Sequence, residues 1–234
     1  MLQRKTSDIF NFCIIVPFYN EEQTIYPICA RLLETGYPIL FVDDGSTDRS
    51  LAILLDIWEK TGKSFNIVRN EFNEGKGSAI KKGAKYAIKM GYDYMMFVDS
   101  DGQNDIGDIE KFKIIAEREP EAKIIIGNRL FNPKGMPKIR YAVNRIMSWI
   151  ISKLAHQHIA DSQCGMRLIH KDVFAHKLAS DRFELESEML VKAGRAGMKI
   201  INCPITCIYK KGRESKINPL PDMIRFFKML FKLF

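Results

Sequence analysis

Two carboxylates near the middle of the chain, Asp99 and Asp101, have the spacing of a metal-binding pair. They follow an apolar run at 94–98, and Ser100 and Gln103 belong to the same segment. Two carboxylates this close are costly to keep ionised unless a cation lies between them. Mg²⁺ and Mn²⁺ prefer oxygen ligands and often bridge a protein carboxylate to a substrate phosphate. The segment therefore predicts a metal and diphosphate site, although Asp and Ser also favour a solvated turn after a strand.

A second carboxylate pair, Asp43 and Asp44, follows another apolar run at 39–42. Here too a strand delivers acid groups at its C-terminal tip, where open α/β sheets bind ligands. Ser46 and Thr47 stand beside this pair. Because such residues favour helix N-termini, an N-cap turn is the alternative role for these two acids.

The elements that must position these acids alternate between strand and helix. Apolar runs predict strands at 13–17, 39–42, 65–69, 94–98 and 123–127. Helices are expected between them, the first capped by Asn20 and running to about Thr35, the others ending near Lys60, Met90 and Glu117. This alternation predicts an α/β architecture with a doubly wound, mostly parallel sheet and short loops.

The alternation ends after Arg129. The remaining chain predicts a loop at 132–138, a helix at about 140–155, a strand at 166–170, a helix ending near 196 and a strand at 200–205. The last is an edge strand, because Pro204 cannot serve inside a sheet. The 140–155 helix has a broad apolar face, made by Met147, Trp149, Ile150, Ile151 and Leu154. We expect that face in the core, with membrane contact as the alternative.

Composition indicates an ordinary folded protein. The 234 residues are 46% hydrophobic and 27% charged, which suits one large α/β domain with an appendage. Five scattered cysteines without a C-x-x-C pair predict neither a zinc site nor a disulfide framework, and a reducing cytosol fits them. We also expect no secretory leader and no transmembrane helix, and hence a cytoplasmic protein.

The net charge of +8 favours anionic partners, and most of the excess lies near the C-terminus. Residues 210–234 carry seven basic side chains against Glu214 and Asp222. This excess accompanies an apolar tail without any RRM, KH or helix-turn-helix pattern. We therefore expect no nucleic-acid partner.

Six motifs occur in a fixed order over nearly the whole chain. They are Val16–Glu22, Val42–Asp48, Asn73–Gly77, Asp99–Gln103, Gly127–Arg129 and Asp161–Arg167. In this order they resemble the inverting family-2 glycosyltransferases with a GT-A fold. The segment 183–188, followed by Pro204 and by 213–216, is similar to the polyprenyl-phosphate and dolichyl-phosphate sugar synthases, the dolichyl-phosphate mannose synthase branch.

The resemblance implies a donor site for a nucleotide sugar, UDP- or GDP-linked. Pro17, Tyr19 and Glu21 match positions that line the base and ribose, and Asp43 with Asp44 matches the carboxylates that hold them. A carboxylate that accepts hydrogen bonds from sugar hydroxyls or base N–H groups suits this role.

The resemblance also implies the phosphate-binding residues. Asp99, Ser100, Asp101 and Gln103 match the loop that holds the diphosphate and a Mg²⁺ or Mn²⁺ cofactor, with Asp101 counted as catalytic. Such an ion offsets charge on the departing nucleoside diphosphate. The basic positions near the donor diphosphate or acceptor phosphate are Arg129, Arg213 and Lys216; the alternative is that they are solvated surface cations.

Asp161 matches the second catalytic position, where many family members place an acid that deprotonates a hydroxyl acceptor. A polyprenyl phosphate acceptor is already anionic near neutral pH and needs no strong base. Asp161 then positions other groups instead of removing a proton. The implied reaction is in-line attack of the acceptor oxygen on the anomeric carbon, with inversion.

The last residues predict a membrane contact. Apolar side chains fill 222–234 around Arg225, Lys228 and Lys232, which share one helical face. We expect an amphipathic helix at 219–234 on the anionic cytoplasmic face of a membrane, which makes the protein peripheral; the alternative is a helix docked on the core. Residues 1–218 are then a single GT-A domain, with a nucleotide-sugar half at about 10–130 and an acceptor half at 131–218.

Two other enzymes stay open at this point. One is a family-2 transferase with a saccharide hydroxyl acceptor, in which Asp161 is a true base. The other is a nucleotide-sugar pyrophosphorylase, which has a similar sheet but a Gly- and Arg-rich loop after its first strand. The segment Phe18–Glu21 does not have that composition.

Overall fold

A computed structural model describes residues 10–62, 65–208, 226 and 228. Within these residues the strands form one seven-stranded sheet, in the order β3-β2-β1-β4-β6-β5-β7. The strands are β1 (Phe12–Phe18), β2 (Ile39–Asp43), β3 (Asn66–Arg69), β4 (Tyr94–Phe97), β5 (Ala122–Asn128), β6 (Arg167–His170) and β7 (Lys199–Pro204). The predicted α/β class and mostly parallel sheet are confirmed.

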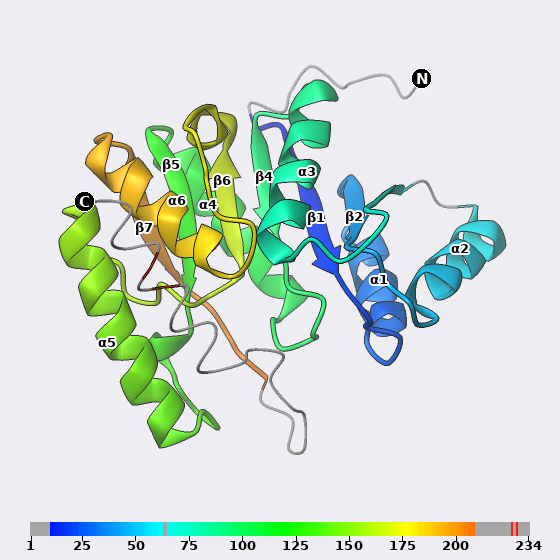
Figure 1. The fold of residues 1–234 in the computed structure, drawn as a ribbon, viewed down its shortest axis with the longest axis horizontal. Helices are drawn as coiled ribbons and strands as arrows, with labels where there is room; N and C mark the ends of the chain where they lie inside the picture. The colour runs from blue at the N-terminus through cyan, green and yellow to red at the C-terminus, as the bar shows by residue number, and fades with distance from the viewer. Residues whose placement is uncertain (1–9, 63–64, 209–225, 227, 229–234) are drawn as a thin grey trace.

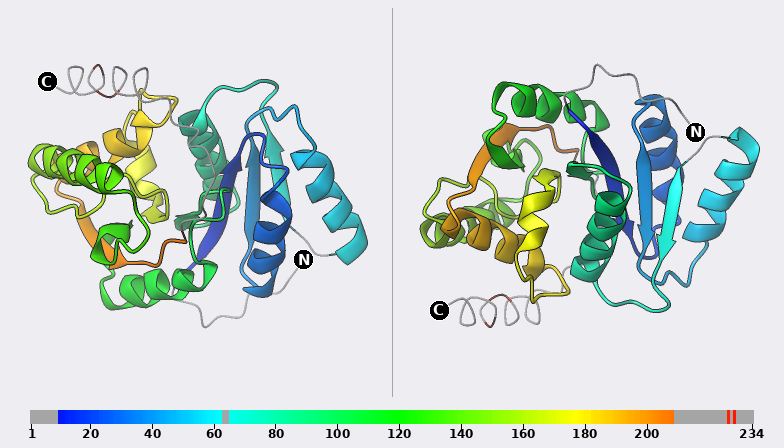
Figure 2. Two further views of the ribbon diagram at one scale, coloured as in Figure 1. Left: turned by 90° about the horizontal axis from the view of Figure 1, so that it is seen from below. Right: turned by 90° about the horizontal axis from the view of Figure 1, so that it is seen from above.

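Helices cover both faces of the sheet (Figure 1). They are α1 (Ile25–Glu34), α2 (Ser50–Thr61), α3 (Lys76–Lys89), α4 (Ile109–Arg118), α5 (Lys138–Ala155) and α6 (Glu184–Arg195), with short 3-10 turns η1 (Ile106–Asp108), η2 (Arg129–Phe131) and η3 (Lys171–Ala175). Figures 1 and 2 show α3 and α6 on one face and α1 and α4 on the other. Helix α5 lies at the outer end of the sheet, packed on α6.

One antiparallel strand changes the second half of the sheet. Strand β6 lies between β4 and β5 and runs against both, whereas every other strand pair is parallel. The loops after β1, β2, β4 and β5 therefore leave the same edge, and the loop that leads into β6 reaches that edge too. All the loops with candidate functional residues meet there.

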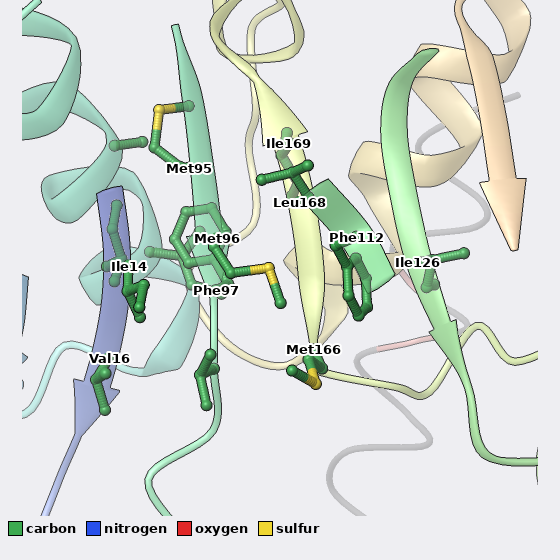
Figure 3. Packing of buried hydrophobic residues seen from close by; sticks show 14 of the residues in the cluster. Ile14, Val16, Met95, Met96, Phe97, Phe112, Ile126, Met166, Leu168 and Ile169 are labelled. Atoms are coloured by element: carbon green, nitrogen blue, oxygen red, sulfur yellow. The ribbon is translucent and has the colours of Figure 1, made fainter. Parts of the chain in front are cut away.

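The core lies along the central strands (Figure 3). Residues from β1, β4, β5 and β6, such as Ile14, Met96, Ile126 and Leu168, are completely or almost completely buried. A parallel strand covered on both faces is a continuous apolar run, which is why the predicted strands fall within one or two residues of the observed ones.

The start of the first helix is where the prediction was wrong. Helix α1 begins at Ile25, and Asn20 is not its N-cap. Asn20 has a left-handed φ of 51°, and its side-chain oxygen accepts the N–H groups of Thr47 and Asp48 at 2.8 and 3.3 Å. The residue therefore joins the loop after β1 to the loop after β2.

The apolar face of α5 packs on the core as expected, except for Trp149. Ile151 is buried as predicted, and Met147, Ile150 and Leu154 pack partly against the core. Trp149, however, is 63% exposed. The face turned inward carries small and polar residues, namely Asn144, Ser148 and Ala155.

The C-terminal tail lies mostly outside the described residues, and so does the predicted 219–234 helix, apart from two positions. Phe226 is helical, buried and part of the core cluster, and Lys228 is helical and exposed. Of the helices described, none has the length and apolarity to cross a membrane.

The packing of α5 on α6 generates a stability prediction. A Cβ on Gly194 of α6 would collide with the backbone carbonyl of Ala155 at the end of α5. Because backbone cannot move aside as a flexible side chain can, we expect Gly194→Ala to lower the free energy of unfolding by about 2 kcal/mol. Urea denaturation measures this. Gly107→Ala, where the added methyl meets only ordinary contacts, is the matched control and should change stability much less; equal effects would contradict the prediction.

Candidate functional site

An ammonium group lies beside the first acid of the Asp99–Asp101 pair. Lys76, the first residue of α3, places its Nζ 2.7 Å from Asp99 Oδ1 and 2.9 Å from Glu186 Oε2. Asp99 lies in the loop that follows β4, and Glu186 lies in the first turn of α6. Asp99 is thus paired with a cation of the protein itself, and a metal contact by Asp99 stays a prediction.

The three side chains stabilise each other's charged forms. Burial favours neutral Lys76, but the carboxylates of Asp99 and Glu186 more than offset this and hold the pKa of Lys76 above its usual range. Burial likewise raises the pKa of Asp99, yet the charges of Lys76, Arg129 and Arg167 outweigh it and lower that pKa. Lys76 and Asp99 therefore stay ionised at neutral pH.

Arg167 fixes the backbone around this ion pair. Its guanidinium, only 2% exposed, donates to the carbonyls of Ser162, Cys164 and Glu186 at 2.9, 2.6 and 2.7 Å. Gly165 lies against the Asp99 carboxylate, so closely that any Cβ there would overlap it. The loop that leads into β6 is thus moulded around Asp99, and glycine is required for that approach.

Asp101 has surroundings different from those of Asp99. It lies in the loop after β4, and its Oδ1 accepts the N–H of Gln103 at 2.9 Å, which shapes the turn. Among the described residues, no three His, Cys, Asp or Glu side chains come together as a ligand set. Mg²⁺ commonly binds through one or two carboxylates, water and substrate phosphates. The site fits an ion held in that way, with Asp101 as the protein carboxylate.

Cys164, in the loop that leads into β6, is not suited to bind an ion. None of the five cysteines forms a disulfide, and Cys164 is completely buried. Burial raises the pKa of the Cys164 thiol to about 12. Since metals bind the thiolate, this side chain is not available to an ion at neutral pH.

Arg129 and Asp161 form a second, deeper ion pair. The Arg129 Nε and Nη2 donate to the two Asp161 oxygens at 2.8 and 3.0 Å, and the Arg129 backbone N–H adds a contact at 3.2 Å. Asp161 is completely buried and Arg129 is 6% exposed. A bidentate pair of this kind fixes the plane of the guanidinium. Both Asp161 oxygens are therefore engaged by Arg129.

The acids after β2 hold loops in place. Asp43 accepts the N–H of Ser46 at 2.8 Å and pairs with Arg69 at 3.1 Å. Asp44 accepts from the Asn70 side chain and from the backbone N–H groups of 74 and 75, at 2.8 to 3.1 Å. Both acids are buried. Neither acid is a helix N-cap, since α2 begins at Ser50 and its N-cap is Arg49. A nucleotide contact by either acid stays a prediction.

The loop after β1 contacts the loop after β4. The Thr24 hydroxyl donates to Glu21 Oε2 at 2.8 Å and lies 2.8 Å from the carbonyl of Ser100. Pro17 is buried at the end of β1, and Tyr19 is half-buried in the loop that follows. These predicted donor-site residues therefore lie at the same edge as Asp99 and Asp101, on a connected set of loops.

Two predicted phosphate ligands, Arg213 and Lys216, lie outside the described residues. The chain that leads towards them is tied to the acidic loop: the Ile208 N–H donates to the Gln103 carbonyl at 2.8 Å, and Thr206 N–H donates to Asp108 at 2.6 Å. The chain that follows β7 therefore passes beside Gln103.

Lys76 and Glu186 are the site residues that sequence reasoning missed. The sequence places both only within motifs, Lys76 in Asn73–Gly77 and Glu186 in the segment 183–188. A lysine between two glycines at a helix start, Gly75-Lys76-Gly77, was the available signal. Its acid partners are 23 and 110 residues away along the chain, so no local pattern identifies them.

Comparison with known proteins agrees with the motif order. The sequence model of Glycosyl transferase family 2 matches residues 13–177. UDP-N-acetylglucosamine–dolichyl-phosphate N-acetylglucosaminyltransferase of Methanococcus voltae is 32% identical over 215 residues, which cover 84% of this chain and 85% of that protein. A dolichyl-phosphate beta-glucosyltransferase of Trichomonas vaginalis is 27% identical over 231 residues, covering 89% and 69%.

A solved structure shares the fold. Glucosyl-3-phosphoglycerate synthase of Mycobacterium tuberculosis, crystallised with Mn²⁺, uridine diphosphate and phosphoglyceric acid, superposes with a TM-score of 0.71. The superposition covers 96% of this chain and 78% of that one, at 15% sequence identity. The similarity extends over the whole sheet.

The ion pair at Lys76 generates a prediction. Lys76→Met leaves two partly buried carboxylates without their shared cation, so we expect the free energy of unfolding at neutral pH to fall by about 2 kcal/mol. Lys85→Met, on an exposed position of the same helix, is the control and should have little effect. Chemical denaturation of both variants measures the difference. Equal stability of the two would show that the ion pair is not a structural constraint.

Proposed function

Because the chain belongs to Glycosyl transferase family 2, which makes it a glycosyltransferase, we propose that it transfers a sugar from a nucleoside diphosphate to a polyprenyl phosphate. The transfer inverts the anomeric centre, and a divalent cation assists it. Family membership sets aside the nucleotide-sugar pyrophosphorylase and agrees with the motif order.

The observation that carries the choice of acceptor is the buried Arg129–Asp161 pair. A hydroxyl acceptor needs a base with an oxygen directed at the incoming proton. Both Asp161 oxygens instead accept from Arg129, at 2.8 and 3.0 Å. A phosphate acceptor is already anionic, and a rigid guanidinium is a suitable group to bind it. The pair therefore supports a phosphate acceptor over a saccharide hydroxyl.

The relatives support the same acceptor class. By their names, the Methanococcus voltae and Trichomonas vaginalis proteins both act on dolichyl phosphate, and they transfer different sugars, N-acetylglucosamine and glucose. We therefore propose a dolichyl or related polyprenyl phosphate for this chain. The sugar is decided by contacts within the donor pocket that differ between such enzymes.

We propose that the nucleotide-sugar donor binds to the loops after β1, β2 and β4. Pro17, Tyr19 and Glu21 would line the base and ribose, with Asp43 and Asp44 beneath them shaping the loops. Asp101, with Ser100 and Gln103 in the same turn, would hold Mg²⁺ or Mn²⁺, and the bound ion would offset charge on the leaving diphosphate. The Mycobacterium tuberculosis structure, which contains Mn²⁺ and uridine diphosphate on a similar fold, is consistent with this arrangement.

The chain's own residues then have distinct tasks. Lys76 keeps Asp99 charge-compensated, so that the floor of the site presents no uncompensated acid to an anionic donor. Asp161 orients Arg129, which would fix the acceptor phosphate for in-line attack on the anomeric carbon. Arg213 and Lys216, proposed from their motif, would add positive charge near the phosphates.

The two halves of the chain divide this work. Residues at about 10–130 would bind the donor and residues 131–218 the acceptor, within one GT-A domain at 1–218. Arg129 stands at the junction, at the end of β5. We propose a protein peripheral to the cytoplasmic face of a membrane, where it meets a lipid acceptor.

Product analysis tests the proposed function directly. Purified protein is given Mg²⁺ or Mn²⁺, a short-chain polyprenyl phosphate and a panel of UDP- and GDP-sugars, and lipid extracts are examined by mass spectrometry. We expect one donor to yield a new glycolipid, and removal of the ion with a chelator to abolish it. Transfer to saccharides alone, with the lipid phosphate untouched, would overturn the acceptor assignment.

A double-variant comparison tests the role of Asp161. If Asp161 acts through Arg129, Asp161→Asn and Arg129→Gln damage the same interaction, and together they lower kcat/KM for the acceptor by about the same factor as Arg129→Gln alone. A general base would contribute separately. A further loss of about tenfold or more in the double variant would therefore identify Asp161 as the base.

A further inference from the structure

Helix α5 carries four large apolar side chains on the face turned away from the protein. Ile139, Val143, Ile146 and Trp149 are 50% to 81% exposed. They recur at intervals of four, three and three residues, so they form one stripe along the helix. We call Ile139, Val143, Ile146 and Trp149 the α5 stripe.

The inward side of α5 combines polar and apolar residues. Its buried positions are Asn144, Ser148, Ile151 and Ala155, and Met147, Ile150 and Leu154 pack partly against the core. The Ser148 hydroxyl accepts the N–H of Ser162 at 2.8 Å, which joins α5 to the loop containing Asp161. A helix at the surface of a soluble protein normally buries its larger apolar residues. Helix α5 has large apolar residues on both faces, because Ile151 is buried and the stripe is exposed. The contact of Ser148 with the site loop helps to fix this orientation.

The charge around the stripe has one sign. The sequence contains no Asp or Glu between Ala122 and Ala160, whereas six basic residues fall within 129–160: Arg129, Lys134, Lys138, Arg140, Arg145 and Lys153. Four of them belong to α5 itself. An apolar stripe within a segment whose charged residues are all basic is complementary to a lipid bilayer with anionic headgroups.

The stripe also lies close to the proposed acceptor site. Helix α5 begins at the edge of the sheet where the parallel strands end (Figure 1). Phe131, which is 71% exposed, is only two residues beyond Arg129. A surface that held the stripe would therefore bring its anionic headgroups to the end of the molecule that contains Arg129.

We propose that α5 is a membrane-docking helix, which lies along an anionic lipid bilayer with Ile139, Val143, Ile146 and Trp149 inserted among the headgroups. A second copy of the same face is a poor occupant, because pairing would bring the basic residues of two α5 helices together. The proposal extends the proposed function, since a polyprenyl phosphate is presented at a lipid surface. It assigns the contact to α5, independently of the 219–234 segment.

The two tryptophans of the chain allow a direct test with the full-length protein. Trp149 lies on the stripe, and Trp58, 50% exposed on α2, lies at the other end of the sheet. In the Trp58→Phe variant only Trp149 fluoresces. We expect its emission to shift to the blue, and to be quenched by brominated lipid, when vesicles of phosphatidylcholine with phosphatidylglycerol are added. In the Trp149→Phe variant, Trp58 should show neither effect.

Flotation measures what the stripe contributes to binding. The paired substitution Ile146→Ser and Trp149→Ser should lower the partition coefficient for anionic vesicles by about tenfold or more, because two inserted side chains are lost. Leu55→Ser with Trp58→Ser, a similarly exposed pair on α2, is the matched control and should leave partitioning unchanged. Circular dichroism of each variant checks that it is folded.

Each other outcome overturns the proposal. Equal partitioning of the two paired variants would place the membrane contact elsewhere on the chain. Trp149 emission that is already blue without lipid would show that the chain covers the stripe itself, and emission that shifts with protein concentration alone would indicate a second copy. No donor is present in these experiments, so their failure would leave sugar transfer untouched, and failure of transfer would leave vesicle binding untouched.

Discussion

The ammonium group of Lys76, held between Asp99 and Glu186, is the contact on which the rest of the site depends. It joins the start of α3 to the loop after β4 and to α6, so three elements from both halves of the chain meet at one charge. An uncompensated acid at this position would repel an anionic donor and would be costly to keep ionised. Asp99 is paired in this way, and Asp101, in the same loop, is the acid that we propose as the metal ligand.

Much of the fold could be predicted because its physical signal is local. Parallel strands buried on both faces are continuous apolar runs, and the acids at 43–44 and 99–101 stand where those runs end. The partners of Lys76 could not be predicted in this way, since they depend on strand β6 entering the sheet between β4 and β5. That insertion brings the 161–167 loop and α6 against Asp99.

The orientation of helix α5 also depends on distant contacts that its own sequence does not predict. Its sequence has apolar residues on more than one arc, and the sequence pattern alone favoured burial of Trp149. The buried arc is decided by close packing on Gly194 of α6 and by the hydrogen bond between Ser148 and Ser162. Because both contacts come from distant segments, the stripe is recognised only in the folded chain. The polar contact also places the stripe and the Arg129–Asp161 pair on one connected unit.

Anomalous diffraction from crystals soaked with Mn²⁺ and uridine diphosphate is the most direct measurement of whether Asp99 or Asp101 binds the metal ion. We predict one manganese peak, beside Asp101 and the diphosphate, with Lys76 still bound to Asp99. A peak that bridges Asp99 and Asp101, with the Lys76 ammonium displaced, would contradict this division. So would bound nucleotide with no manganese beside Asp101.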